Sequence, residues 1–232
     1  MLNRRLFLAA AAASLATGCA SSRRIGPGPA RPGTGPVASA RISPEYLTMY
    51  RAMPEERFPV PAVDLTKIDP LYYRQLVDYA AVEPAGTIIV DTPNRFLYLT
   101  MENGKAMRYG VGIGRAGFAW GGRAKIQYKK AWPTWTPPKE MIERDPDSAK
   151  WANGMPGGPD NPLGARALYL YEGNRDSIYR IHGTNQPWSI GLNISSGCIR
   201  MNNDDVTDLY SRVEGGAKVI VLMQGAALYK GV

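Results

Sequence analysis

The sequence predicts a mainly β fold with minor α content, a mixed sandwich or barrel-like domain with one main helix near its C-terminal end. Three observations lead to this prediction. Short apolar runs typical of strands alternate with turn signals from residue 86 onwards. One clear helical pattern follows near residue 204. After an N-terminal leader and linker, about 150–190 residues remain, which suffices for one well-buried domain.

The first nineteen residues have the pattern of an export leader. A twin-arginine pattern begins at Arg4, and residues 6–16 form an apolar stretch. This stretch is shorter than the ~20 residues of a membrane-spanning helix and fits a signal-peptide core. Cys19 ends a segment that resembles a bacterial lipobox, although Ala16 stands where leucine is usual. We therefore expect a periplasmic protein whose membrane contact is a lipid on Cys19, with conventional cleavage as the alternative.

Residues 20–43 are rich in Ala, Gly, Pro, Ser and Arg and contain almost nothing to bury, which predicts a disordered tether. The net charge of +8 is concentrated in the leader and this tether together, because six of the 28 basic residues precede Glu45, the first acidic one. The basic arm suits an anionic membrane surface. The rest of the chain is nearly neutral and has no electrostatic signature of nucleic-acid binding.

Residues 44–85 form an approach segment punctuated by prolines. Asp69 before Pro70 predicts one short helix through Val77, with Asp69 as its N-cap. The β-rich domain is expected to span residues 86–224. Its first part reads as a hairpin of residues 87–92 and 95–100. Asn103-Gly104 then predicts a second tight turn, which leads into a strand over residues 105–113.

Further strands are expected at residues 124–131, 167–171, 178–181 and 218–223. The helix is expected over about residues 204–213, with Asn202 or Asn203 as its cap and two acidic residues complementing its dipole. Between these elements, residues 132–163 form a stretch rich in Pro, Gly and Trp. Loops of this length are uncommon in compact domains and are usually functional.

His182 is the only histidine of the chain, and Cys198 follows it sixteen positions later. An ordinary thiol is mostly protonated at pH 7 and attacks slowly, whereas a nearby imidazole takes its proton and returns one to a leaving amine. The two residues are therefore the minimum set for acyl transfer. Cys198 is expected to form no disulfide bond, because Cys19 lies at the leader boundary. A buried, inert cysteine is the alternative.

The neighbours of this pair suggest supporting roles. Gly197 permits a sharp turn whose N–H groups suit an oxyanion pocket. A backbone carbonyl near Gly183 or Thr184 is the expected acceptor that orients the second imidazole nitrogen. Arg200 follows Cys198 by two positions, so if the segment is a strand, both side chains lie on the same face. Its expected role is a substrate carboxylate clamp or a brace for the loop, with a surface ion pair as the alternative.

Two tryptophans are candidates for a groove wall. Trp135 lies in a proline-stiffened segment, and Trp188 lies between His182 and Cys198. Filling the core is the alternative role of such indoles. A metal site is not expected, since one His and one Cys cannot complete a zinc coordination sphere without carboxylates at ligand spacing.

The block His182-Gly183-Thr184, followed by residues 195–201 (Ser-Ser-Gly-Cys-Ile-Arg-Met), resembles the signature of the L,D-transpeptidase catalytic domain, the YkuD family of bacterial cell-wall enzymes. Residues 133–138, 161–164 and 203–206 also resemble that family. The resemblance covers about residues 86–223, and two linked blocks in the correct order and spacing make it specific.

The resemblance implies a peptidoglycan L,D-transpeptidase with a β-sandwich fold and no cofactor. Cys198 would attack the carbonyl between the diamino acid and the terminal D-residue of a tetrapeptide stem. D-alanine would leave, and His182 would act as general base and acid. An amine would resolve the thioester. This acceptor amine would come from a neighbouring stem (a 3→3 crosslink), from a lysine of an outer-membrane protein, or from a free D-amino acid. The resemblance also implies acylation by carbapenems.

The implied site is larger than the pair. Gly183 would orient His182, the N–H groups of Gly197 and Cys198 would serve the oxyanion, and Arg200 would brace the loop or bind a stem carboxylate. The candidate substrate-binding residues are Trp135, Thr184, Trp188 and Ser196.

Three other functions stay open. A thiol hydrolase such as an L,D-carboxypeptidase differs only in using water as the acceptor. A sortase-like transpeptidase typically has its histidine much further upstream of its cysteine. A non-catalytic wall-binding lipoprotein would have little reason to keep both Cys198 and His182.

Overall fold

A single mixed sheet of ten strands dominates the computed structural model, which describes residues 42–114, 120–192 and 198–223. The strands are β1 (Gln75–Asp78), β2 (Ile88–Asp91), β3 (Phe96–Met101), β4 (Lys105–Gly110), β5 (Gly112–Ile113), β6 (Gly122–Ala131), β7 (Arg166–Glu172), β8 (Arg175–His182), β9 (Ile199–Arg200) and β10 (Lys218–Leu222).

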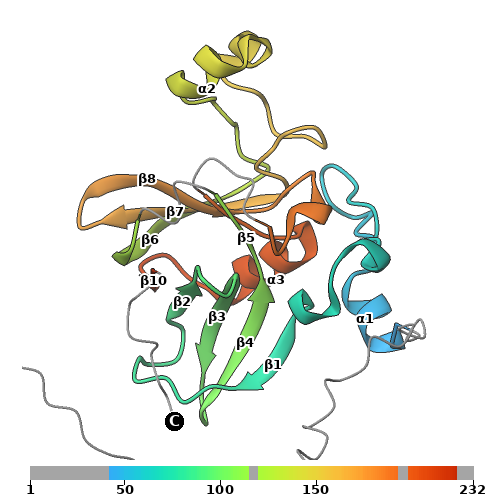
Figure 1. The fold of residues 1–232 in the computed structure, drawn as a ribbon, viewed down its shortest axis with the longest axis vertical. Helices are drawn as coiled ribbons and strands as arrows, with labels where there is room; N and C mark the ends of the chain where they lie inside the picture. Colours follow the sequence, from blue (N-terminus) through green and yellow to red (C-terminus); the bar gives the residue numbers. More distant parts are fainter. Residues whose placement is uncertain (1–41, 115–119, 193–197, 224–232) are drawn as a thin grey trace, which may run out of the picture. The chain divides into compact units, whose positions relative to one another are not determined.

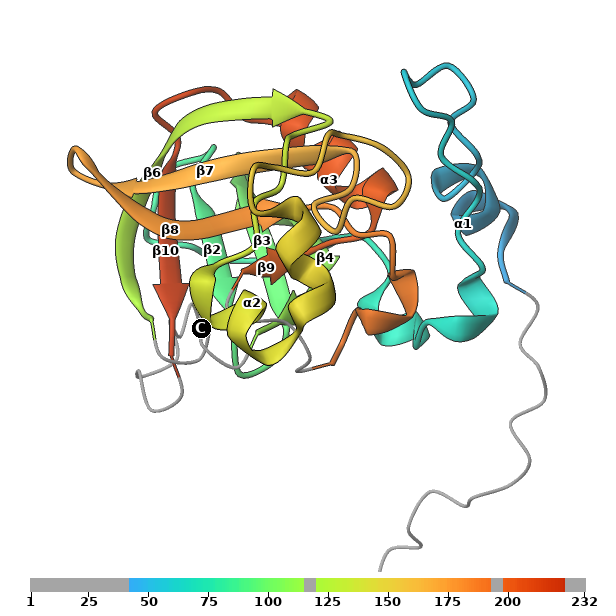
Figure 2. The ribbon, with the colours of Figure 1, turned by 90° about the horizontal axis from the view of Figure 1, so that it is seen from above.

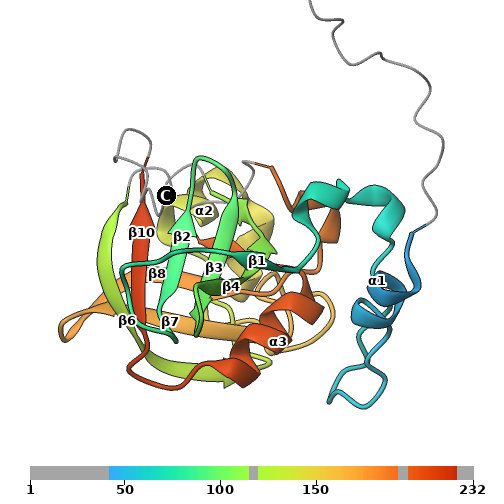
Figure 3. The same ribbon diagram turned by 90° about the horizontal axis from the view of Figure 1, so that it is seen from below.

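The strand order across the sheet is β1-β4-β3-β2-β10-β6-β7-β8-β9-β5. The pairs β2–β10 and β8–β9 are parallel, and the others are antiparallel. The sheet curls so that β7 and β8 run across β2, β3 and β4 (Figures 1 and 3). Apolar side chains from both halves of the sheet form one core between them, including Val90, Leu97, Leu168 and Ile181. The mainly β prediction is confirmed.

The predicted hairpins are present. Strands β2 and β3 pair antiparallel, and β3 turns into β4 through Asn103 and Gly104. Both turn residues have positive φ, 59° and 64°, as a type I′ hairpin requires. The expected strand over residues 105–113 is divided in two. Its first part pairs with β3 as β4, and Gly112–Ile113 pairs with β9 as β5.

Among the described residues, α3 (Asn203–Arg212) is the one helix longer than six residues, so the single main helix is also confirmed. Asn202 occupies the cap position, and Asp204 and Asp205 lie in the first turn, as predicted. Val206 and Leu209 bury one face of the helix in the core. Since α3 begins three residues after Arg200, the end of β9, this packing ties the strand that follows Cys198 to the core.

The segment before β2 differs from the prediction in one element. It contains α1 (Pro44–Met49) and two 3-10 turns, η1 (Leu65–Lys67) and η2 (Pro70–Tyr72). Asp69 caps η2 as predicted, accepting the N–H of Leu71 at 2.9 Å. The prediction of a helix through Val77 is wrong, because residues 75–78 form β1 on the free edge of β4. A strand partner outweighs a weak local helix preference.

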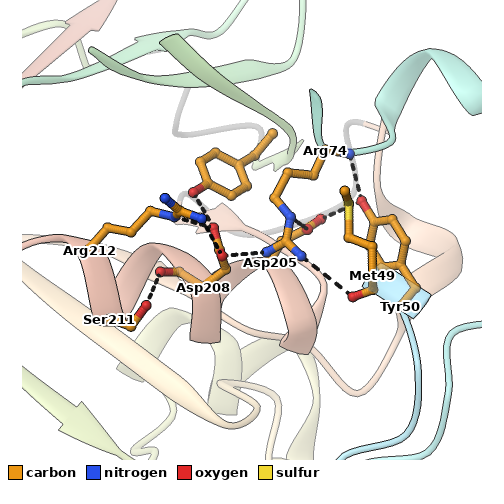
Figure 4. A network of polar contacts seen from close by, with 8 residues as sticks. Met49, Tyr50, Arg74, Asp205, Asp208, Ser211 and Arg212 are labelled. Carbon is orange, nitrogen blue, oxygen red and sulfur yellow. Dashed lines mark hydrogen bonds and ion pairs between the residues drawn. The ribbon is translucent and has the colours of Figure 1, made fainter. Parts of the chain in front are cut away.

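A buried polar network joins this segment to α3 (Figure 4). The Nη1 atom of Arg74 lies 3.1 Å from a carboxylate oxygen of Asp208, and its Nε lies 3.8 Å from Asp205. Tyr50 donates to Asp205 at 3.2 Å and accepts the N–H of Arg74 at 2.7 Å. Burial raises the pKa of Asp205 to about 7, against the opposing charge of Arg74.

The long loop over residues 132–163 contains α2 (Lys139–Arg144) and η3 (Pro146–Trp151). Helix α2 lies beyond β8, on the side of the sheet away from β2–β4 (Figures 1 and 2). Asn161 holds the base of the loop. It is fully buried, donates to the carbonyls of Pro133, Met155 and Pro156 at 3.0–3.2 Å, and accepts the N–H of Leu163. None of the described helices is long and apolar enough to cross a bilayer.

Candidate active site

Two adjacent parallel strands carry the candidate catalytic residues. His182 is the last residue of β8, and Cys198 immediately precedes β9. In the ladder Ile181 faces Ile199, and both are buried in the core. Because successive side chains in a strand point to opposite faces, the residues before and after these isoleucines point away from the core. The strand pairing therefore brings His182 and Cys198 to the same face.

That face is one wall of a cavity of about 320 Å³. The opposite side comes from the loop over residues 132–163, including Trp135 and Met141 of α2. The lining residues on β7–β9 and the Cys198 turn are Tyr169, Ile178, Arg180, His182, Cys198 and Arg200. The cavity thus combines the thiol, the imidazole, two guanidinium groups and a mostly apolar facing wall.

The imidazole of His182 has a defined tautomer. The side chain is buried, and its Nδ1 atom lies 2.5 Å from the carbonyl oxygen of Gly183. A carbonyl oxygen only accepts hydrogen bonds, so Nδ1 carries the ring proton and Nε2 keeps a free lone pair. This is the kind of backbone acceptor expected near Gly183 or Thr184.

Burial sets the protonation of both groups. It lowers the pKa of His182 to about 4, although the hydrogen bond to Gly183 opposes the shift. Burial raises the pKa of the Cys198 thiol, and a backbone hydrogen bond from Arg180 and the charges of Arg180 and Arg200 oppose it. The free protein therefore holds a neutral thiol and a neutral imidazole at pH 7. His182 is in the correct state to accept a proton.

Glycine at position 183 is required by a close approach. A Cβ atom there would lie 2.3 Å from Oδ1 of Asn203. The same oxygen would lie 2.2 Å from a Cβ on Gly164, and it accepts the N–H of Ala165 at 2.9 Å. The side chain of Asn203 thus links segments 161–164, 182–184 and 203–206. This close packing fixes the Gly183 carbonyl that orients His182.

Arg200 braces the short turn that contains Trp188. Its Nη1 donates to Gln186 and to Ser189, each at 3.2 Å, within and next to η4 (Pro187–Ser189). No carboxylate pairs with it among the residues that the structure describes. Arg200 therefore retains an uncompensated positive charge at the cavity wall.

Sequence reasoning missed Arg180 and its partner Asp176. The Arg180 guanidinium forms two hydrogen bonds with the Asp176 carboxylate, at 2.7 and 2.8 Å, and lies over the ring of Tyr169. Counting back two residues along the strand from His182 would have indicated Arg180. The contact with Asp176 depends on an irregularity in β8 that alternation does not predict.

The other predicted substrate residues are distributed differently. Trp135 lines the Cys198 cavity. Thr184 is buried and accepts the N–H of Gln186, and it lines a separate cavity of about 170 Å³. Trp188 is 51% exposed on η4 and does not line the Cys198 cavity. Cys19, Ser196 and Gly197 lie outside the described residues. In the described ranges, no three His, Cys, Asp or Glu side chains gather as metal ligands would.

Comparison with known proteins gives the family. Residues 85–221 match the YkuD model, described as the L,D-transpeptidase catalytic domain. The chain is similar to the probable L,D-transpeptidase YbiS of Escherichia coli K12, with 35% identity over 139 residues, which are 58% of this chain and 43% of that protein. The probable L,D-transpeptidase ErfK/SrfK of the same strain is 33% identical over 144 residues, 60% of this chain and 44% of that protein.

The chain spans less than half the length of these curated relatives. It is also similar to a crystal structure from Brucella melitensis that is named a probable carnitine operon oxidoreductase. That structure is 50% identical, with a TM-score of 0.48, and the match covers 68% of this chain and 99% of that one. Because the family model matches more than half of the chain, the protein belongs to the YkuD family of L,D-transpeptidase catalytic domains.

Proposed function

We propose that the protein is a peptidoglycan L,D-transpeptidase that transfers a stem-peptide acyl group through a thioester on Cys198. The observation that carries the proposal is the presence of Cys198 and His182 on one wall of one cavity, with the His182 Nδ1 proton held by the Gly183 carbonyl. Family membership supplies the reaction class. Because the Cys198 thiol and the His182 imidazole are both neutral, the first proton transfer runs from the thiol to the imidazole.

In the first half-reaction, the Cys198 sulfur attacks the carbonyl carbon of the diamino acid in a tetrapeptide stem. The thiol proton passes to Nε2 of His182 as the S–C bond forms, because neither group is charged beforehand. The oxyanion is assigned to the N–H groups of Cys198 and Gly197. His182 then protonates the departing amine, D-alanine leaves, and the acyl group stays on sulfur.

In the second half-reaction, an amine attacks the thioester. His182 removes a proton from the attacking nitrogen, and the thiolate that leaves recovers a proton from the imidazolium. The unpaired charge of Arg200 suits a stem carboxylate, while its contacts with Gln186 and Ser189 suit a brace for the loop. The acceptor is a neighbouring stem, an outer-membrane protein lysine or a D-amino acid. The alternative is water, which makes the enzyme an L,D-carboxypeptidase.

Purified tetrapeptide muropeptides test the proposal. The wild type is incubated with them, with and without a D-amino acid, and the products are resolved by chromatography and mass spectrometry. We expect D-alanine together with crosslinked dimers or exchanged stems, and none of these with Cys198→Ala. Tripeptides as the sole product support the hydrolase, and the absence of D-alanine release contradicts both.

The site of action is a further proposal, which rests on the leader pattern of residues 1–19 and the candidate lipid site Cys19. We place the enzyme in the periplasm with an N-terminal lipid. Metabolic labelling with radioactive palmitate in a bacterial host should mark the wild type and leave Cys19→Ala unlabelled. Equal labelling of the two proteins contradicts lipidation.

A further inference from the structure

We propose that Ile178 is a specificity-determining residue of the Cys198 cavity. A strained backbone holds its apolar side chain where it contacts the aliphatic side chain of the acyl donor, on the residue whose carbonyl is attacked. This inference rests on the proposed acyl transfer and names the part of the donor that the cavity selects.

The backbone of Ile178 is an outlier. Its φ angle is +67°, in the left-handed region. A β-branched side chain crowds its own backbone there, so such residues avoid this region far more strongly than Asn or Gly. The other non-glycine residues with positive φ in the described part of the chain are Arg95, Asn103 and Trp132, none of them β-branched.

A bulge in β8 imposes this conformation. In the β7–β8 ladder, Tyr169 faces Arg180 whereas Tyr171 faces Asp176, so three residues of β8 lie opposite the one residue Leu170 of β7. Such bulges bend a strand and re-aim a side chain, and they occur often beside active sites. Two contacts fix the bulge. Asp176 accepts the N–H of Ile178 at 2.8 Å, and Ser177 donates its hydroxyl to the Leu170 carbonyl at 2.6 Å.

The bulge is connected to the reaction centre. The carboxylate of Asp176 that receives the Ile178 N–H also binds the Arg180 guanidinium through two hydrogen bonds. The backbone of Arg180 in turn makes a hydrogen bond to Cys198. The strand that carries Ile178 therefore has a fixed position relative to the nucleophile, which a contact surface for the donor requires.

Packing does not explain why an isoleucine stands here. Its side chain is 78% exposed, yet it lines the cavity that contains Cys198. Strain of this kind persists at functional sites, where surrounding contacts hold it in place. The facing wall is mostly apolar as well, and it includes Pro138, Met141 and Leu163. A ligand with a hydrocarbon chain beside the attacked carbonyl would cover Ile178 and remove its apolar surface from water.

Two variants separate contact from strain. Ile178→Gly removes the side chain and relieves the backbone, and Ile178→Val keeps the branched side chain and most of the apolar surface. Each is compared with the wild type by kcat/KM for two tetrapeptide donors, one with diaminopimelate or lysine and one with alanine at the attacked position. Tm is measured in parallel.

In the wild type we expect the long-chain donor to be preferred. In Ile178→Gly this preference should fall by about tenfold, since a lost apolar contact of this size is worth that much in discrimination. Its Tm should rise by about 2 °C, because glycine adopts a positive φ without strain. Ile178→Val should keep the wild-type preference and Tm.

A preference unchanged in Ile178→Gly overturns the inference, whatever the Tm. So does a Tm well below the wild type, which would make Ile178 a structural residue. If the wild type itself releases no D-alanine from either donor, the proposed function fails instead. The two failures are therefore distinguishable in one set of measurements.

Discussion

The Nδ1 atom of His182 lies 2.5 Å from the carbonyl oxygen of Gly183, so the only basic nitrogen of this ring is Nε2. Because the imidazole is buried, its pKa is lowered to about 4. The thiol of Cys198 has a raised pKa for the same reason. The catalytic pair is thus a neutral base beside a neutral acid, unlike the thiolate–imidazolium pairs of papain-like proteases.

This protonation state predicts the pH dependence of acylation. The base function of His182 is present above its folded pKa, so kcat/KM should stay level from about pH 5.5 to neutrality and fall with an apparent pKa near 4. Stopped reactions analysed by intact-protein mass spectrometry give the rate, and circular dichroism at each pH identifies acid unfolding. An acid limb centred near 6.5 would contradict a neutral, buried imidazole.

The second prediction concerns the support of that imidazole. In Gly183→Ala the new Cβ would lie 2.3 Å from Oδ1 of Asn203, so the Gly183 carbonyl has to move. Acylation should slow by about 100-fold, since a displacement of about 1 Å of a catalytic group has that effect. Gly215→Ala is the matched control, because its Cβ would meet only ordinary contact with Gln127. Equal rates for the two variants would remove Gly183 from the site.

The third prediction concerns the loop that carries Trp135. Asn161→Ala leaves the carbonyls of Pro133 and Pro156 without this donor and the buried N–H of Leu163 without its acceptor, while the Met155 carbonyl keeps the N–H of Trp135. The free energy of unfolding should fall by about 3 kcal/mol, as expected for several unsatisfied buried groups. KM for the donor should rise because the Trp135 wall of the cavity shifts. Asn174→Ala, at an exposed position, should change neither quantity.

The fourth prediction concerns the buried network on α3. The folded-state pKa of Asp205 is about 7, above its unfolded value, so its stabilising contribution is present at low pH and decreases as pH rises through 7. An Asp205→Asn variant lacks this decrease. Between pH 6 and 8.5 the stability of the variant relative to the wild type should therefore rise by about 1 kcal/mol.

Thermal denaturation of both proteins at the two pH values gives this difference, and the comparison cancels the opposite contribution of His182. A constant difference between wild type and variant would mean that Asp205 is already ionised at pH 6. Asp204→Asn is a useful second variant, since burial raises the pKa of Asp204 to about 6.

Local patterns sufficed for much of the fold. The Asn103-Gly104 turn, the apolar runs of the later strands and the acidic first turn of α3 each depend on residues close together in sequence. The helix expected through Val77 failed because the edge of β4 lies about thirty residues away and offers a strand partner. Such non-local pairing has no signature in the segment itself.

The same limit applies to the site. Alternation along the chain correctly suggested that Arg200 and Cys198 face the same way, and both line the cavity. Thr184 is a candidate through the family resemblance and Trp188 through its place between His182 and Cys198 in the sequence, and neither lines that cavity. The contact between Asp176 and Arg180 follows from a bulge, whose position depends on the partner strand.

Intact-protein mass spectrometry after incubation with a carbapenem or a tetrapeptide donor tests the central claim most directly. The wild type should gain the mass of one acyl group, Cys198→Ala should gain none, and His182→Gln should gain it far more slowly. An adduct that persists in Cys198→Ala would contradict the account, because the acyl group would then be carried by another residue.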